Sequence, residues 1–294
     1  MRSAATTVAL AACAAAIASQ APATAAARQD DLLRRFAPVL RYDHRERDRT
    51  TAVDAIESRL GDREAVRLAG ERPGREVVYG HAVRGADGST WLQYWLFLLG
   101  NRQDRGILGT GRHEGDWELV QLRLGAGGRP DLATLTEHSW AEGCPARGLE
   151  RAGAAPVVYV ANGSHALYSR AGTHDRPFPD PNDEADGRGR RVRPPVVAID
   201  DGTAWTRWPG RWGASEAGIV PGEQSSPRGP AFQDGDPWRR PAAFHEARAR
   251  PCGSGPPGRP WQAPALAALA AAAALAATLI RRRSRRARHL QSPP

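Results

Sequence analysis

The chain has 294 residues, of which 41% are hydrophobic, and its 31 glycines and 24 prolines favour a loop-rich β architecture over a helical bundle. The formal net charge is +9, and all 41 basic residues are arginine. Seven of these arginines lie near the two ends, at Arg2 and within residues 281–288, and without them 34 basic residues face 32 acidic ones. This nearly neutral middle argues against nucleic acid as a partner.

Residues 1–27 have the pattern of a secretory signal peptide, with a positive start, an apolar stretch over residues 8–18 and small residues up to Ala27. We expect cleavage near Ala27 and export of a domain that covers residues 28–252. Two alternatives stay open. The motif LAAC would make Cys13 a lipidated residue, and the segment would otherwise act as an anchor that is not removed.

The exported domain begins with a predicted short helix in DDLLRRF and a strand in PVLRY. Two runs rich in Val, Tyr, Trp and Phe follow, separated by the turn signal GADGS. The second run is almost continuously apolar, which predicts a central strand buried on both faces. Later strands are predicted in DWELVQLRL, in PVVYVANGSHALY on both sides of its NGS turn, and in PVVAI. The predicted strands cover residues 75–83, 90–99, 116–124, 156–168 and 195–199.

Two long segments lack strand periodicity. Residues 175–186 are acidic but lack the register of a helix-flanked calcium loop, so we expect them to be solvated surface. Residues 205–261 should lie over the core as irregular structure, and we expect Trp205, Trp208 and Trp212 to pack there rather than form a sugar platform. The many short strands predict a mainly β fold, namely a β-sandwich with long irregular loops.

The C-terminal part reads as a Pro- and Gly-rich linker over residues 253–263 and a transmembrane helix over residues 264–280. Trp261 would anchor the outer interface. The arginine-rich tail, residues 281–294, follows at once and would stay in the cytoplasm. We therefore expect a single-pass protein of the cell membrane with its main domain extracytoplasmic. The alternative is a soluble alanine-rich helix.

Cys144 and Cys252 are the two cysteines left once the signal peptide is removed. In an oxidising compartment they are expected to form a disulfide, and two unpaired buried thiols are the alternative. Neither lies in a CxxC or Cys/His spacing, so the sequence gives no support for a zinc finger.

The stretch GRHEGDWELVQLRL, residues 111–124, raises a question of charge. In a strand, Asp116 and Glu118 share a face with the apolar residues that follow, and buried carboxylates are costly without a partner. His113 would lie on the other face unless Gly115 adopts a left-handed or bulged conformation. Either a divalent cation such as Mg²⁺, Ca²⁺ or Mn²⁺ or a network of arginines would compensate the two acids.

Several stretches occur in an order that resembles a known family: APVLRY, WLQYWLFLLGN, HEGDWELVQLRL, EHSWAEG, APVVYVANGSHALY, GRWG and SPRGPAFQDGDPW. The set resembles the family named after the vacuolar protein sorting protein sixty-two, over about residues 32–252. That family includes plant proteins of unknown function and exported bacterial members. A more distant likeness is to the necrosis- and ethylene-inducing-like (NPP1-type) cytolysins, whose motif runs Gly-His-Arg-His-Asp-Trp-Glu.

The second likeness implies a β-sandwich with a divalent cation near that motif, used for binding plant sphingolipid headgroups. The second motif histidine is Gly115 here, which departs from the pattern. Asp104 lies one residue out of register with an upstream acidic ligand of that family. His165 in GSHA resembles a further histidine of the family's site. By resemblance, the metal ligands would be His113, Asp116, Glu118, His165 and Asp104.

These observations predict a membrane-anchored binding protein whose divalent cation, Mg²⁺ or Ca²⁺, recognises a lipid or glycan headgroup. His138 and Glu142 would line the same cleft as ligand-binding residues. One alternative is a metal-dependent hydrolase of a phosphoester or glycoside, with His113 or His165 as general acid or base. Another is a structural surface protein without metal. HEGDW does not have the HExxH spacing and NGSHA lacks a GxSxG elbow, so no catalytic residue is assigned.

Overall fold

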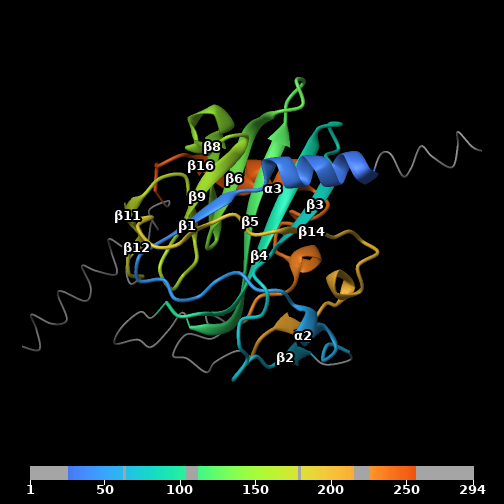
Figure 1. Ribbon diagram of the computed structural model, residues 1–294, viewed down its shortest axis with the longest axis vertical. Coiled ribbons are helices and arrows are strands. Elements are labelled where there is room, and N and C mark those ends of the chain that lie inside the picture. Colours follow the sequence, from blue (N-terminus) through green and yellow to red (C-terminus); the bar gives the residue numbers. More distant parts are fainter. Residues whose placement is uncertain (1–25, 62–63, 104–111, 178–179, 215–224, 256–294) are drawn as a thin grey trace, which may run out of the picture.

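The computed structural model describes residues 26–61, 64–103, 112–177, 180–214 and 225–255 (Figure 1). Across these ranges, no helix is both long enough and apolar enough to cross a membrane. Residues 1–25 of the predicted signal peptide lie outside the described ranges, as do Cys13, Asp104, the predicted span over 264–280 and the basic tail.

The larger sheet has seven strands in the order β14-β3-β4-β5-β6-β7-β16. Neighbours from β3 to β7 pair antiparallel, whereas the edge strands β14 and β16 run parallel to their neighbours. The two longest strands, β4 and β5, form the centre of the sheet. The bounds are β14 Val196–Ala198, β3 Val78–Arg84, β4 Thr90–Asn101, β5 His113–Leu124, β6 Pro130–Glu137, β7 Trp140–Pro145 and β16 Ala249–Pro251.

The smaller sheet has the order β10-β9-β1-β13, and β8 pairs with β9. Strands β1 and β9 are parallel, so the loops that follow them emerge at the same edge of the sheet. This edge contributes to the candidate site below. The bounds are β10 Leu167–Tyr168, β9 Ala155–Val160, β1 Val39–Tyr42, β13 Arg191–Val192 and β8 Arg151–Ala152.

The remaining elements are short. A helix over residues 26–36 precedes β1, as the sequence predicted for part of this segment. Two pairs of strands form small separate sheets, β2 Ala65–Val66 with β15 Arg211–Trp212 and β11 Gly172–His174 with β12 Asp183–Ala185. The helices are α2 Asp54–Glu57, α3 Pro241–Arg248, and the 3₁₀ turns η2 Ala146–Gly148, η3 Ala204–Arg207 and η4 Pro230–Phe232.

One hydrophobic core fills the space between the two larger sheets. Leu96 of β4 and Val120 of β5 pack with Leu40 of β1 and Val158 of β9, and each of these side chains is fully buried. The expectation of a mainly β fold is therefore confirmed. The term β-sandwich describes it only in part, because the pairing is mixed and two further small sheets are present.

A second core covers the opposite face of β4 and β5. Phe97 and Trp117 lie on this face, and the segment after β14 folds over them. Strand β4 is thus covered on both sides, as its continuous apolar sequence predicted (Figure 1). The prediction that the tryptophans of the irregular segment pack on the sheets is also confirmed, because Trp205, Trp208 and Trp212 are all buried in this core.

The sequence did not predict β6 and β7. These strands bury polar side chains, including Thr134, Glu137 and Glu142, and the buried polar residues hide the alternation on which a strand prediction depends.

Candidate functional site

A cavity of about 270 Å³ lies where β5, β6 and the turn after β6 meet the C-terminal segment. The structure brings four of the residues predicted for the site into this cavity, which we call the carboxylate cavity. Part of its wall is aromatic, including Trp140 and Phe244, and Arg248 contributes a positive charge. The predicted residues that line it are His113, Asp116, Glu118 and His138.

Asp116 and Glu118 follow the strand period of two along β5. They lie on the same face as Val120, which belongs to the core between the sheets, and both carboxylate residues are 6% exposed. The prediction that two acids would be buried side by side on this strand is confirmed.

Gly115 explains how His113 reaches the same cavity. Its φ is +67°, in the left-handed region that favours glycine, and the pairing with β4 keeps one register on both sides of it. A Cβ at this position would lie 1.6 Å from the carbonyl oxygen of Trp212. The ring of His113 turns back on this segment, with Nδ1 2.7 Å from the carbonyl oxygen of Gly115.

Asp116 has a histidine as its ionic partner within the described ranges. Its Oδ2 lies 2.9 Å from Nδ1 of His165 and accepts a hydrogen bond from Asn101 at 3.4 Å. His165 is fully buried and has a left-handed φ of +58° at the end of the turn that follows β9. Burial by itself lowers the pKa of a histidine, but the interactions with Asp116 and Glu46 outweigh it and raise the pKa of His165 to about 10.

Glu118 has a neutral partner. The hydroxyl of Thr136 on β6 donates a hydrogen bond to Oε2 of Glu118. Burial and the nearby charge of Asp116 raise the pKa of Glu118 well above its usual range. Within the described ranges no arginine pairs with Asp116 or Glu118.

Two acids that the sequence did not single out lie on the far side of His165. Glu46 and Asp48 follow β1, and the backbone N–H of Gly163 in the turn after β9 donates to Oε2 of Glu46. Burial opposes ionisation of Glu46, but the nearby charge of His165 and the hydrogen bond from Gly163 outweigh it and lower the pKa of Glu46 to about 2. The sequence signal that could have indicated them is their place in the loop just after a predicted strand, PVLRY.

One group of possible metal ligands in the described residues differs from the predicted set. Glu46, Asp48 and His165 form a group whose ligand atoms all lie within 4.8 Å of one another, whereas His113, Asp116 and Glu118 do not form such a group in this part of the chain. Asp116 and Glu118 each line the carboxylate cavity.

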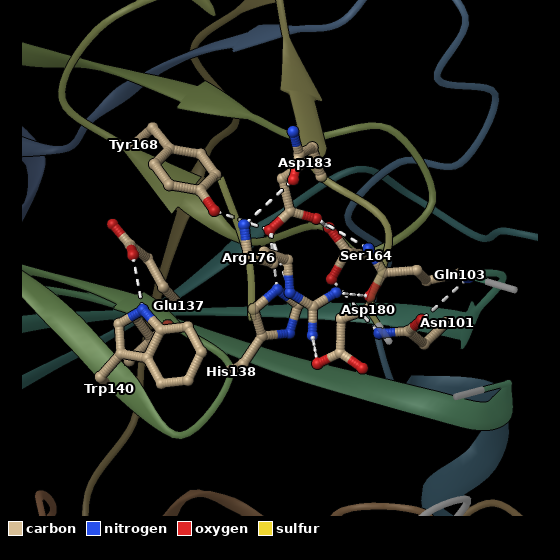
Figure 2. A network of polar contacts seen from close by, with 12 residues as sticks. Asn101, Gln103, Glu137, His138, Trp140, Ser164, Tyr168, Arg176, Asp180 and Asp183 are labelled. Atoms are coloured by element: carbon tan, nitrogen blue, oxygen red, sulfur yellow. Dashed lines mark hydrogen bonds and ion pairs between the residues drawn. The ribbon is translucent and has the colours of Figure 1, made fainter. Parts of the chain in front are cut away.

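His138 belongs to a buried polar network centred on Asp183 (Figure 2). Its Nε2 lies 2.8 Å from Oδ2 of Asp183, which also accepts a bond from Tyr168, while Oδ1 accepts from Ser164 and Gln103. Burial opposes the charge on Asp183, but His138 and Arg176 outweigh it and lower the pKa of this carboxyl.

This network corrects the prediction for residues 175–186. They were expected to be solvated, yet Asp180 and Asp183 are 7% and 1% exposed. The buried guanidinium of Arg176 lies 2.9 Å from Asp180 and 3.9 Å from Asp183 (Figure 2). An acidic segment can be buried when it carries its own cation and meets hydroxyl donors, which a count of charges does not reveal.

Glu142 does not lie with His138. It lines a different cavity, of about 160 Å³, and its two oxygens accept hydrogen bonds from the backbone N–H groups of Ser169 and Gly253. The prediction that His138 and Glu142 line the same cleft is therefore corrected. Strand β7 leads away from the carboxylate cavity, so Glu142 lies in the other cavity.

Cys144 and Cys252 form a disulfide, with their Cα atoms 5.2 Å apart. The predicted pairing is confirmed, and the alternative of two unpaired thiols is wrong.

No family model matches the chain, and no curated protein does so either. The chain is similar to several solved structures. One is necrosis and ethylene inducing protein 2 from the causal agent of cocoa's witches' broom disease, at 11% identity over 57% of this chain and 72% of the other, with a TM-score of 0.36. Another is described as a toxin fold for microbial attack and plant defense, at 15% identity over the same shares, with a TM-score of 0.37.

A third is NLPPya in complex with mannosamine, at 15% identity over 57% of this chain and 72% of the other, with a TM-score of 0.36. Proteins of the necrosis- and ethylene-inducing kind are thus among the structures to which this chain is similar. The resemblance to the family of the vacuolar protein sorting protein sixty-two finds no support in these comparisons.

Proposed function

We propose that the protein is an exported binding protein, anchored by its C-terminal segment, in which a divalent cation at Asp116 and Glu118 recognises a lipid or glycan headgroup. The observation that supports this proposal is the pair of buried carboxylates that line one cavity from adjacent positions of the same strand face.

The chemistry of the cavity favours a hard cation. Two carboxylates that are close together and buried resist ionising at the same time, as the raised pKa of Glu118 indicates. Asp116 and Glu118 would hold Mg²⁺ or Ca²⁺, and water or the bound ligand would complete the coordination. When bound, the cation would supply a positive charge that attracts hydroxyl or phosphate oxygens of a ligand.

The wall of the carboxylate cavity suits a ring with both polar and apolar faces. The indole of Trp140 is partly buried there, and its N–H donates to Glu137 at 2.8 Å, which holds the ring in place (Figure 2). An aromatic plane beside carboxylate ligands would accept the apolar face of a sugar or cyclitol while its hydroxyls turn to the cation.

The test is calorimetric titration of the full chain with inositol phosphate and hexosamine headgroups, in Mg²⁺ or Ca²⁺ and again after removal of metal with EDTA. We expect binding in the presence of the cation only, and at least a 10-fold loss of affinity in Glu118→Gln because one anionic ligand is removed. Glu150→Gln is the control, since this side chain is exposed and does not line the carboxylate cavity. Equal binding with and without metal would contradict the proposal.

A metal-dependent hydrolase is the second candidate, and one observation favours it. His138 lines the carboxylate cavity and is held by the buried Asp183, an arrangement that orients a general base. In this case the chain would turn over a phosphodiester or glycoside in the presence of metal, and both Asp116→Ala and His138→Gln would abolish turnover. Binding without turnover across such a panel would exclude it.

A further inference from the structure

His165 has a side that the proposed function does not use. Its Nδ1 is bonded to Asp116, whereas its Nε2 lies 3.6 Å from Oε2 of Glu46 and 3.9 Å from Oδ2 of Asp48. Both separations are too long for a good hydrogen bond. Within the described residues, neither Nε2 of His165 nor Oδ2 of Asp48 has a hydrogen-bond partner, although both atoms are buried. Polar atoms buried in this way cost free energy unless something binds them.

The parallel pair of strands β1 and β9 creates this arrangement. Asp43 donates its backbone N–H to the carbonyl of Val160 at 3.1 Å, which ties the ends of the two strands together. The loop that follows β1 carries Glu46 and Asp48, and the turn that follows β9 carries His165. Residues far apart in the sequence thus meet at one edge of the smaller sheet.

We propose that Glu46, Asp48 and His165 form a second divalent-cation site, of the class that takes Zn²⁺, separate from Asp116 and Glu118. Their ligand atoms all lie within 4.8 Å of one another. Two ligands about 2.1 Å from a tetrahedral zinc ion are about 3.4 Å apart, so separations of 3.6 and 3.9 Å require only small movements of the side chains.

The hydrogen bond of His165 to Asp116 matches the second shell of a metal site. A histidine that binds metal through one ring nitrogen usually donates the other N–H to a carboxylate, which fixes the tautomer and the ring plane. The 2.9 Å contact from Nδ1 to Asp116 has this form, and an ion that displaces the proton of Nε2 would bind the lone pair of that nitrogen.

The two carboxylates are also held in place. Arg102 donates to Oδ1 of Asp48 at 2.5 Å, so Oδ2 is the oxygen left for an ion. Oε1 of Glu46 accepts the backbone N–H of Asp48 at 2.6 Å. Cavities of about 420 and 410 Å³ are lined by Glu46 and by Asp48 respectively, and they offer routes for the ion to enter.

A proton is the natural competitor of the ion, because His165 protonated at Nε2 would face the same two carboxylates. The choice of a dication follows from charge. Glu46, Asp48 and Asp116 surround one imidazole, and Arg102 contacts a single member of the group. Zn²⁺ in place of one proton compensates this excess of negative charge more fully.

The experiment uses the full chain, stripped with a chelator and titrated with Zn²⁺ against a chromophoric competitor, in excess Mg²⁺ to occupy the carboxylate cavity. We expect one tight equivalent of Zn²⁺. Glu46→Gln and Asp48→Asn should each lower its affinity at least 10-fold, and Asp116→Asn about 10- to 100-fold as an outer partner. Circular dichroism confirms that the variants fold.

Two matched variants make the assignment specific. Glu184→Gln removes an acid that lines the same cavity as Glu46 and should leave Zn²⁺ affinity unchanged. His44→Gln removes the exposed histidine of another group of possible ligands, which it forms with Asp43 and Asp186, and it should also leave the tight equivalent in place.

The inference is overturned if the native chain has no tight Zn²⁺ site, or if Glu46→Gln and Asp48→Asn retain it. The outcome is independent of the proposed function, because Glu118→Gln should keep the tight Zn²⁺ while losing cation-dependent binding of headgroups.

Discussion

At the scale of single residues, the site consists of acids whose partners differ. Asp116 faces His165, Glu118 accepts from Thr136, and Asp183 gathers hydroxyl, amide and imidazole donors. Several donors and two cations offset the desolvation of Asp183, whereas the single hydroxyl that bonds to Glu118 does not offset its burial. Glu118 is therefore the member of the carboxylate cavity that gains most from an added cation.

Glu137 allows a direct test of this reasoning through pH. It is 4% exposed, and burial together with the charge of Glu142 raises its pKa from 4.5 to about 8. Between pH 4.5 and 8 the folded chain therefore binds more protons than the unfolded chain, and this residue's contribution to stability falls as pH rises. Glu137→Gln cannot ionise, so its stability relative to that of the native chain should rise over this interval, with a slope of up to about 1.4 kcal/mol per pH unit.

Urea unfolding at a series of pH values measures this difference. Glu150→Gln, on the surface, is the control and should show no such trend. Parallel stability curves for Glu137→Gln and the native chain would show that the carboxyl of Glu137 stays ionised in the folded protein.

At the scale of elements, strand β5 depends on close contact with the segment that covers it. Gly115→Ala would place a methyl group 1.6 Å from the backbone oxygen of Trp212 at β15, on a residue with φ of +67°. We expect it to lower the free energy of unfolding by at least about 3 kcal/mol, because backbone strain and overpacking add. The midpoint of urea unfolding measures the loss.

Gly127→Ala is the matched substitution, since a methyl group there meets nothing within 4 Å. Its effect should stay within about 0.5 kcal/mol. If both variants unfold at similar urea concentrations, β15 is not packed against Gly115 as described.

The strand pattern of β3, β4 and β5 could be read from the sequence because side chains alternate or are uniformly apolar there. The same pattern correctly assigned Asp116 and Glu118 to one buried face. Strands β6 and β7 could not be read in this way, since Thr134 and Glu142 are buried polar residues whose partners come from other elements.

At the scale of the whole molecule, the disulfide joins the larger sheet to the last described segment. Cys144 in β7 and Cys252 just after β16 are 108 residues apart in sequence. Closing a loop of about 100 residues restricts the unfolded chain enough to stabilise the fold by up to about 4.7 kcal/mol. Reduction should therefore lower the free energy of unfolding by about 2–5 kcal/mol.

Urea unfolding with and without dithiothreitol measures this effect. The double variant Cys144→Ala, Cys252→Ala should be less stable than the oxidised native chain and should not respond to the reductant. A native chain whose unfolding midpoint does not change on reduction would contradict the expected contribution.

The sequence by itself determined the mainly β character, the central strand buried on both faces, the shared face of the two acids on β5 and the pairing of the cysteines. These properties depend on local alternation, or on there being few cysteines to pair. Tertiary structure alone decided what faces those acids, because His165 reaches Asp116 through the turn after β9, and Glu46 and Asp48 join it through a parallel strand pair. Parallel pairing brings together residues that are distant along the chain, and no local pattern encodes which loops will meet.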